Sequence, residues 1–179
     1  MRITRFGHLE GHTIRKIELG YPDGLKSSPD EMRFTLSSGA KYRLFHEKDC
    51  TEDVWIKDIV GDLDDLVGSP LHIADESSNE NATPKGHETP DDTDSYTWTC
   101  YRMATNKGYV TIWWYGESNG YYSESVDFAA IGRKEPWDSR RGMAIKTFKG
   151  RHNQGGVEIL EPQDDGPRPI YFMASLGAY

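Results

Sequence analysis

The densest group of potentially reactive side chains lies in residues 45–53. Zinc accepts imidazole, thiolate and carboxylate ligands, so a metal site here would use His46, Asp49, Cys50 and either Glu52 or Asp58. A histidine beside the thiol would instead form a Cys/His nucleophilic pair. On an extended strand His46 and Cys50 lie about 13 Å apart, so a shared metal ion requires a bend between them. A polar hairpin end is the structural alternative to both interpretations.

A second candidate site surrounds the turn at residues 116–120, where aromatic rings stand beside hydroxyl and amide groups. Its members are Trp113, Tyr115, Ser118, Asn119, Tyr121 and Tyr122. Rings beside Asn and Ser side chains suit a flat ligand such as a nucleobase, or a hot spot for a protein partner. Aromatic residues in strands more often belong to the core, and that alternative stays open.

The segment at residues 150–156 is glycine-rich and basic, and it contains Arg151. Its backbone amides and the guanidinium group could receive a phosphate or a carboxylate. The spacing matches neither the dinucleotide-binding glycine pattern nor the P-loop, and a flexible turn explains the same composition.

The chain has no H-E-x-x-H zinc-protease motif and no paired-cysteine metal motif. The closely spaced acids in residues 61–70 lack the alternating oxygen ligands and the late glutamate of a calcium loop. We therefore expect a protein that binds rather than catalyses, with no cofactor other than the metal considered above.

The chain has 179 residues and a formal net charge of −8, which fits one domain and argues against general nucleic-acid binding. No apolar run is long enough to span a membrane, and the N-terminus lacks the apolar core of a signal peptide. We expect a cytoplasmic protein in which Cys50 and Cys100 are reduced. Acids gather in residues 75–94 and bases in 132–155, which predicts either two solvated faces or a late basic surface that receives an anion.

Apolar and polar residues alternate with a period of two along most of the chain, which predicts a mainly β fold. We expect strands at residues 12–19 and 54–60, a hairpin at 31–47, and a central three-stranded meander at 96–103, 109–115 and 121–128. One short helix is predicted at residues 62–68. The fold class is therefore β-rich α+β, with a twisted antiparallel sheet, a small barrel or a sandwich.

Composition divides the chain into two regions. Residues 1–131 should form a β-rich core domain with a mobile acidic loop at 75–95, since that segment has no apolar period. Residues 132–179 should form a basic connector and a short β extension packed on the core. Its candidate strands are 143–149, 157–160 and 170–174.

Residues 42–128 resemble a family of small uncharacterised proteins found chiefly in bacteriophages and prophages. The resemblance rests on four blocks: His46-x-x-Asp49-Cys50, Asp58-Ile59-x-Gly61-Asp62-Leu63-x-Asp65-Leu66-x-Gly68-x-Pro70, Thr97-Trp98-Thr99 with Lys107-Gly108, and Gly116-x-Ser118-Asn119-Gly120-Tyr121-Tyr122-Ser123-Glu124. Thr51 stands where the family would have a second cysteine, which weakens a thiolate metal site. Residues 132–179 fall outside the resemblance.

The resemblance implies a biological context rather than a chemistry, because the family has no assigned activity. We expect a phage-encoded accessory binding protein, with counter-defence as one role. Its partner would be a host protein or a small anionic or nucleotide ligand in the cytoplasm of an infected or lysogenic bacterium. The alternatives are a metal-dependent enzyme that uses His46, Asp49, Cys50 and Asp58, and a minor virion or assembly protein.

Overall fold

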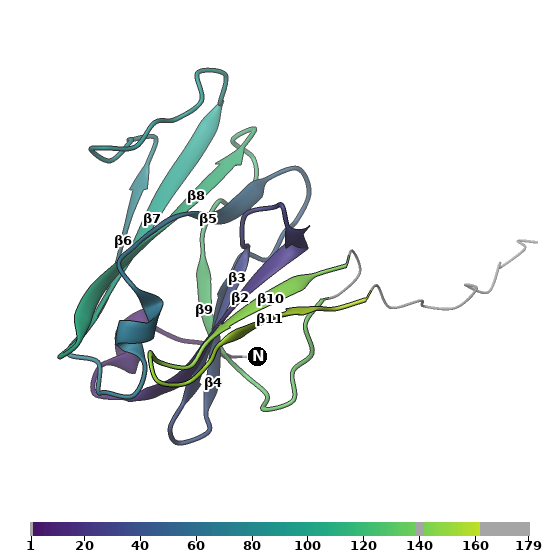
Figure 1. Ribbon diagram of the computed structural model, residues 1–179. Coiled ribbons are helices and arrows are strands. Elements are labelled where there is room, and N and C mark those ends of the chain that lie inside the picture. The colour runs from purple at the N-terminus through teal and green to yellow at the C-terminus, as the bar shows by residue number, and fades with distance from the viewer. Residues whose placement is uncertain (1, 139–141, 162–179) are drawn as a thin grey trace, which may run out of the picture.

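The structure is a computed structural model that describes residues 2–138 and 142–161. Its strands form two antiparallel sheets that share one hydrophobic core (Figure 1). Ile17, Phe34 and Leu44 enter this core from one sheet, and Met103 and Ile112 enter it from the other. The predicted mainly β fold is confirmed, in a form with two sheets.

The larger sheet has seven strands and contains both ends of the described chain. Its order is β1 (Arg2–Ile3), β9 (Asp127–Ile131), β4 (Lys41–Phe45), β3 (Glu31–Leu36), β2 (Ile14–Leu25), β10 (Ala144–Phe148) and β11 (Gly156–Ile159). The predicted hairpin is confirmed as β3–β4, which turns at Gly39 with φ of +86°. A positive φ favours glycine because a side chain would clash with the backbone there.

The smaller sheet has four strands, in the order β5 (Asp53–Val60), β8 (Gly108–Ser118), β7 (Ser95–Thr105) and β6 (Ile73–Glu80). Strands β7 and β8 form a long hairpin that pairs from Ser95↔Ser118 to Thr105↔Gly108. Alternate β8 residues Val110, Ile112 and Trp114 are fully buried against the larger sheet. The period-two pattern of this strand therefore identifies the face that packs on the core.

Two expectations about the smaller sheet are wrong. Residues 121–128 do not form the third strand of a meander, because the chain leaves this sheet after β8 and returns as β9 between β1 and β4. The position beside β8 belongs instead to β5, and the far side of β7 pairs with β6, whose residues 75–80 were expected in the acidic loop. Only Ala74 of β6 is buried, so this edge strand carries almost no apolar signal.

The predicted short helix is a single 3₁₀ turn, η2 (Leu63–Leu66). Asp62 caps it by accepting a hydrogen bond from the amide of Asp64 at 2.9 Å, and both leucines are buried. A second 3₁₀ turn, η1 (Phe6–Leu9), was not expected from the sequence. It also buries its first and last side chains in the core.

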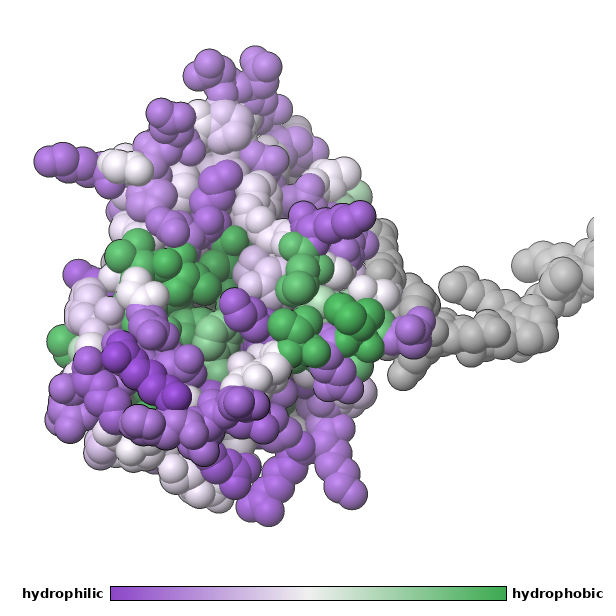
Figure 2. All heavy atoms as spheres, viewed as in Figure 1, coloured by the Kyte–Doolittle hydropathy of each residue, from purple (hydrophilic) through white to green (hydrophobic). Residues whose placement is uncertain are grey.

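The basic C-terminal region contributes two of its three expected strands within the described residues, β10 and β11. The third, at 170–174, lies outside them. Strand β10 pairs with β2 over five residues, from Ala144↔Tyr21 to Phe148↔Ile17, and therefore extends the sheet of the first 131 residues. None of the helices described is long and apolar enough to cross a membrane. The face shown in Figure 2 is mostly hydrophilic, with apolar residues gathered across its middle.

Candidate functional site

The chain crosses from one sheet to the other through residues 119–126, here called the crossover loop. Two side chains build its first turn: Ser118 Oγ accepts from the Gly120 amide at 3.0 Å, and Asn119 Oδ1 accepts from the Tyr121 amide at 3.1 Å. Gly120 has φ of +90°, which lets the chain reverse at this point. The reversal places Tyr121 at the tip of the loop, where the residue is 90% exposed.

The predicted aromatic site separates into an exposed part and a packed part. Tyr121 and Asn119 are exposed, and Tyr122 is half-buried at the loop surface. Tyr115 is only 1% exposed, and its ring packs 4.9 Å from Trp98 and 5.1 Å from Trp55. Tyr115 therefore belongs to an aromatic packing layer and is closed to a partner.

Trp113 lies in the same layer, on the face of the smaller sheet that points away from the core. Residues 81–94, here called the covering loop, fold over it. The ring of His87 lies 4.7 Å from Trp98 and 4.7 Å from Trp113, and the Trp98 indole donates to Thr89 Oγ1 at 3.2 Å. Trp113 remains half-buried under this cover.

A polar pocket of about 280 Å³ opens beside the crossover loop, between that loop and strands β6 and β7. Hydroxyl groups from β6, β7 and the loop line it, together with the carboxylates of Glu76, Glu80 and Glu124. None of the lysine or arginine side chains in residues 2–138 and 142–161 lines this pocket. The pocket is therefore suited to a cationic or hydroxyl-bearing group and unsuited to an anion.

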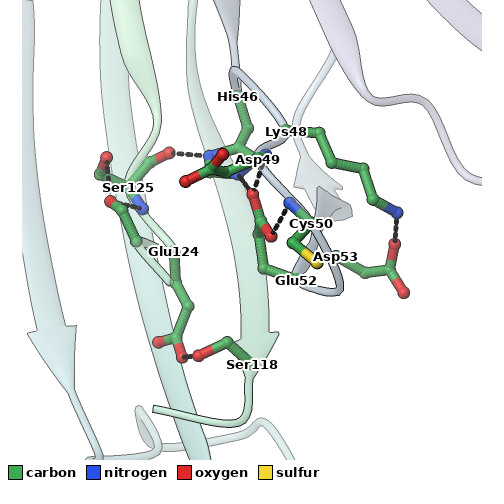
Figure 3. A network of polar contacts seen from close by, with 10 residues as sticks. His46, Lys48, Asp49, Cys50, Glu52, Asp53, Ser118, Glu124 and Ser125 are labelled. Carbon is green, nitrogen blue, oxygen red and sulfur yellow. Dashed lines mark hydrogen bonds and ion pairs between the residues drawn. The ribbon is translucent and has the colours of Figure 1, made fainter. Parts of the chain in front are cut away.

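Glu124 is the fixed carboxylate of the polar pocket, at 7% exposure. Its two oxygens accept hydrogen bonds from Ser118 Oγ at 2.6 Å and from Thr97 Oγ1 at 2.8 Å (Figure 3 shows the contact with Ser118). The loop can lie this close to β8 because residue 116 is glycine: a Cβ there would lie 2.9 Å from the Glu124 carbonyl oxygen.

The spacing Gly116-x-Ser118-x-Gly120 also matches the nucleophile elbow of α/β-hydrolases. In that motif the serine sits on a turn between a strand and a helix, and a histidine accepts its proton. Ser118 instead ends β8 and leads into the crossover loop, and its hydroxyl donates to Glu124. The serine is therefore a structural part of the loop.

A buried carboxylate organises the hairpin end at residues 46–53. Glu52 accepts hydrogen bonds from the amides of Asp49 and Cys50, the latter at 2.8 Å, and from His46 Nε2 at 3.1 Å (Figure 3). Burial by itself would raise the pKa of Glu52, but these three hydrogen bonds outweigh it and lower the pKa to about 2. Glu52 is therefore ionised at neutral pH.

His46 joins this hairpin end to the crossover loop. Its Nδ1 lies 2.7 Å from the Ser125 carbonyl oxygen, while Nε2 contacts Glu52. His46 thus uses both ring nitrogens to link the two segments. These contacts form a polar hairpin end, which is the structural alternative considered for residues 46–53.

The four residues considered for a metal site are not arranged around a common point. Both ring nitrogens of His46 are already hydrogen-bonded, and Asp49 contributes its backbone amide. Cys50 is exposed and hydrogen-bonds with Tyr122, which raises the pKa of that tyrosine. Asp58 lies on β5, 3.9 Å from His87. Among the described residues no group of three His, Cys, Asp or Glu side chains could hold a metal ion.

Arg151 lies on the turn between β10 and β11 and lines neither the polar pocket nor the crossover loop. Its guanidinium contacts Asp65 at 2.8 Å and Asp62 at 3.5 Å, so it is anchored on η2. The residues predicted to bind a ligand therefore belong to two separate places.

Sequence reasoning did not select Glu124, Thr97 or Glu76, which shape the polar pocket. Glu124 and Thr97 do stand inside the blocks that carry the family resemblance, so that signal was available. Glu76 gave no signal, because its role depends on the pairing of β6 with β7.

A family model described as a domain of unknown function, DUF7448, matches residues 8–128. No curated protein and no solved structure matches the chain. The matched residues include the whole smaller sheet, the crossover loop and the hairpin end at 46–53. Because the match spans more than half of the 179 residues, the chain belongs to the DUF7448 family.

Proposed function

We propose that this protein is a binding protein whose crossover loop docks a partner protein. We further propose that it is a phage-encoded accessory factor that acts on a host protein in the bacterial cytoplasm, as in counter-defence. The observation that carries the docking proposal is the Tyr121 ring, 90% exposed at the tip of a turn that its neighbours hold in place. Exposed tyrosines on rigid supports are frequent hot spots of protein interfaces.

The loop is organised before any partner arrives. Glu124 holds it to Ser118 and Thr97, and His46 holds Ser125 from the other side. A loop that is already ordered loses little conformational entropy on binding, which favours affinity.

The charge beside the loop indicates which partner would fit. Glu76, Glu80 and Glu124 line the adjacent polar pocket, and the loop itself has no basic residue. This arrangement disfavours a small anionic ligand at the crossover loop. It favours a protein surface that offers lysine or arginine next to an apolar depression for the tyrosine.

The proposal is tested by placing a photo-crosslinking amino acid at position 121 and, as a matched control, at position 109. Tyr109 is another exposed tyrosine, at 50%, but it lies at the opposite end of β8. In bacterial host lysate, position 121 should give a specific adduct that position 109 does not give. Tyr121→Ala should abolish capture of the same partner by the affinity-tagged protein, while Tyr109→Ala should leave capture unchanged. Equal adducts at both positions, or full capture by Tyr121→Ala, would refute the docking surface.

A further inference from the structure

A second cavity lies where β2, η2, the β7–β8 turn and the β10–β11 turn meet. Its volume is about 270 Å³, and Arg15, Lys107, Lys149, Arg151 and His152 line it; we call it the basic pocket. None of the Asp and Glu side chains in the described part of the chain belongs to its wall. A wider groove of about 550 Å³ adjoins it and shares Arg15, Lys149 and His152. Three segments distant in sequence thus bring basic side chains together in a protein whose net charge is −8.

Three of these bases have no carboxylate partner among the residues that the structure describes. Arg15 and Lys149 are exposed and form no ion pair there. The Lys107 ammonium donates to the Val67 carbonyl oxygen at 2.7 Å, which orients it without neutralising its charge. The wall therefore presents three basic groups that no described carboxylate pairs with directly.

Arg151 has a different role from the one that the sequence suggested. Asp65 and Asp62 neutralise its charge, and Asp64 Oδ1 accepts the Gly150 amide at 3.0 Å. These contacts fix the β10–β11 turn on η2. Arg151 is thus a positioning residue that places Lys149 and His152 at the mouth of the pocket.

The pairing of β10 with β2 brings bases of the two strands together. Strand β10 pairs with β2 up to Phe148↔Ile17, so Lys149 follows directly beside the strand that carries Arg15 and Lys16, of which Lys16 is paired with Glu18 at 3.0 Å. Like charges on neighbouring strands destabilise a sheet. We propose that the basic pocket is a binding site for a small phosphate-bearing anion, held chiefly by Arg15 and Lys149.

The chemistry of the wall fits a phosphate or diphosphate group. A guanidinium offers paired donors to phosphate oxygens, and an ammonium adds a point charge. The hydroxyl groups of Thr13 and Ser37 and the apolar side chains of Ile14 and Val67 complete the lining. This site is separate from the crossover loop, and so the inference does not depend on the proposed docking function.

The test is isothermal titration calorimetry of the full chain at low ionic strength with inorganic phosphate, pyrophosphate and ATP. We expect one saturable site. Arg15→Ala and Lys149→Ala should each weaken binding about tenfold, the scale of one lost charge-assisted hydrogen bond. Lys85→Ala removes the same charge from the covering loop and should leave the affinity unchanged. The melting temperature of each variant shows whether it remains folded.

The three ligands distinguish the sources of the phosphate group. Tightest binding of pyrophosphate assigns the site to a diphosphate, and tightest binding of ATP assigns it to a nucleotide. Arg151→Ala should weaken binding through loss of the anchored turn, and Arg151→Lys, which keeps a cation for Asp65, should recover part of the affinity. No saturable heat with any of the three, an equal loss in Lys85→Ala, or tighter binding of a short single-stranded oligonucleotide than of ATP would overturn the proposal.

Discussion

At the scale of single residues, Glu52 holds the hairpin end together as an ionised buried carboxylate. Its pKa in the folded protein is about 2, against an ordinary value of 4.5. A carboxyl group whose pKa is lower in the folded than in the unfolded protein stabilises the fold at any pH above its unfolded-state pKa. That stabilisation is lost as the pH falls towards the pKa of the folded protein. Glu52→Gln removes the charge but keeps the shape. We expect it to lower the free energy of unfolding at pH 7, with a difference from wild type that shrinks between pH 4.5 and pH 2.

Chemical denaturation at a series of pH values measures this difference. Glu47→Gln is the matched control, because Glu47 is an exposed neighbour on the same hairpin end. It should change stability little at any pH. A constant difference between Glu52→Gln and wild type down to pH 2 would contradict the assigned role.

Residue types predicted the exposed part of the aromatic site but not its packed part. Asn119 and Tyr121 flank Gly120 in a turn, and local turn chemistry is enough to predict that they are accessible. Tyr115 alternates with Trp114 on β8, so the pattern places it on the outer face. Its burial depends on Trp98, on Trp55 and on the nearby covering loop, contacts that no local pattern contains.

At the scale of elements, the link between β5 and η2 passes close to the backbone of β8, and Gly61 makes this approach possible. Its φ is +108°, and a Cβ there would lie 2.5 Å from the Tyr109 carbonyl oxygen. Gly11 has φ of +79°, but no atom lies within 4 Å of such a Cβ. An alanine at position 11 therefore tests the cost of the backbone conformation without a steric clash.

We therefore expect Gly11→Ala to destabilise the protein by about 1 kcal/mol through the left-handed backbone alone. Gly61→Ala should exceed that loss by a further 1–3 kcal/mol, roughly, because the clash forces two strands apart. Urea denaturation of the two variants measures both values. Equal losses would show that the close approach at Gly61 relaxes freely.

The covering loop should protect the outer aromatic layer through His87. His87→Ala removes ring contacts to Trp98 and Trp113, each worth about 1 kcal/mol. Tryptophan emission should shift to the red and acrylamide should quench it more strongly. His72→Ala removes an exposed histidine from outside this layer and should leave the spectrum unchanged. An unaltered spectrum in His87→Ala would mean that the loop is not held by this ring.

Elements with an apolar period could be predicted, and edge elements could not. The hairpin of β3 and β4 reads directly from alternation around Gly39. Strand β6 consists mostly of polar side chains, because only one of its residues reaches the core. It forms by pairing along its own full length with β7. The crossing of the chain from β8 to β9 likewise depends on the assembled larger sheet, where β9 pairs with the edge of β4.

At the scale of the whole molecule, β10 is the element that decides whether the C-terminal region is an appendage or part of the core. A chain ending at residue 131 lacks the strand that pairs with β2 and buries Ala144 and Ile145. Relative to a chain ending at residue 161, we expect it to melt at lower temperature and to self-associate through the exposed β2 edge.

Differential scanning calorimetry and light scattering of the two truncated chains test this expectation. If the chain of residues 1–131 stays monomeric and has the same melting temperature as the longer chain, the first 131 residues form an independent domain. The comparison isolates residues 132–161, because both chains lack everything beyond them.

The two cysteines differ in a way that has a practical consequence. Cys100 is buried, which raises the pKa of its thiol, whereas Cys50 is exposed and touches Tyr122 at the edge of the crossover loop. A thiol-reactive dye should therefore attach at one position without any engineered residue. A dye on Cys50 would therefore lie beside the proposed docking surface and could report partner binding by a change in its fluorescence.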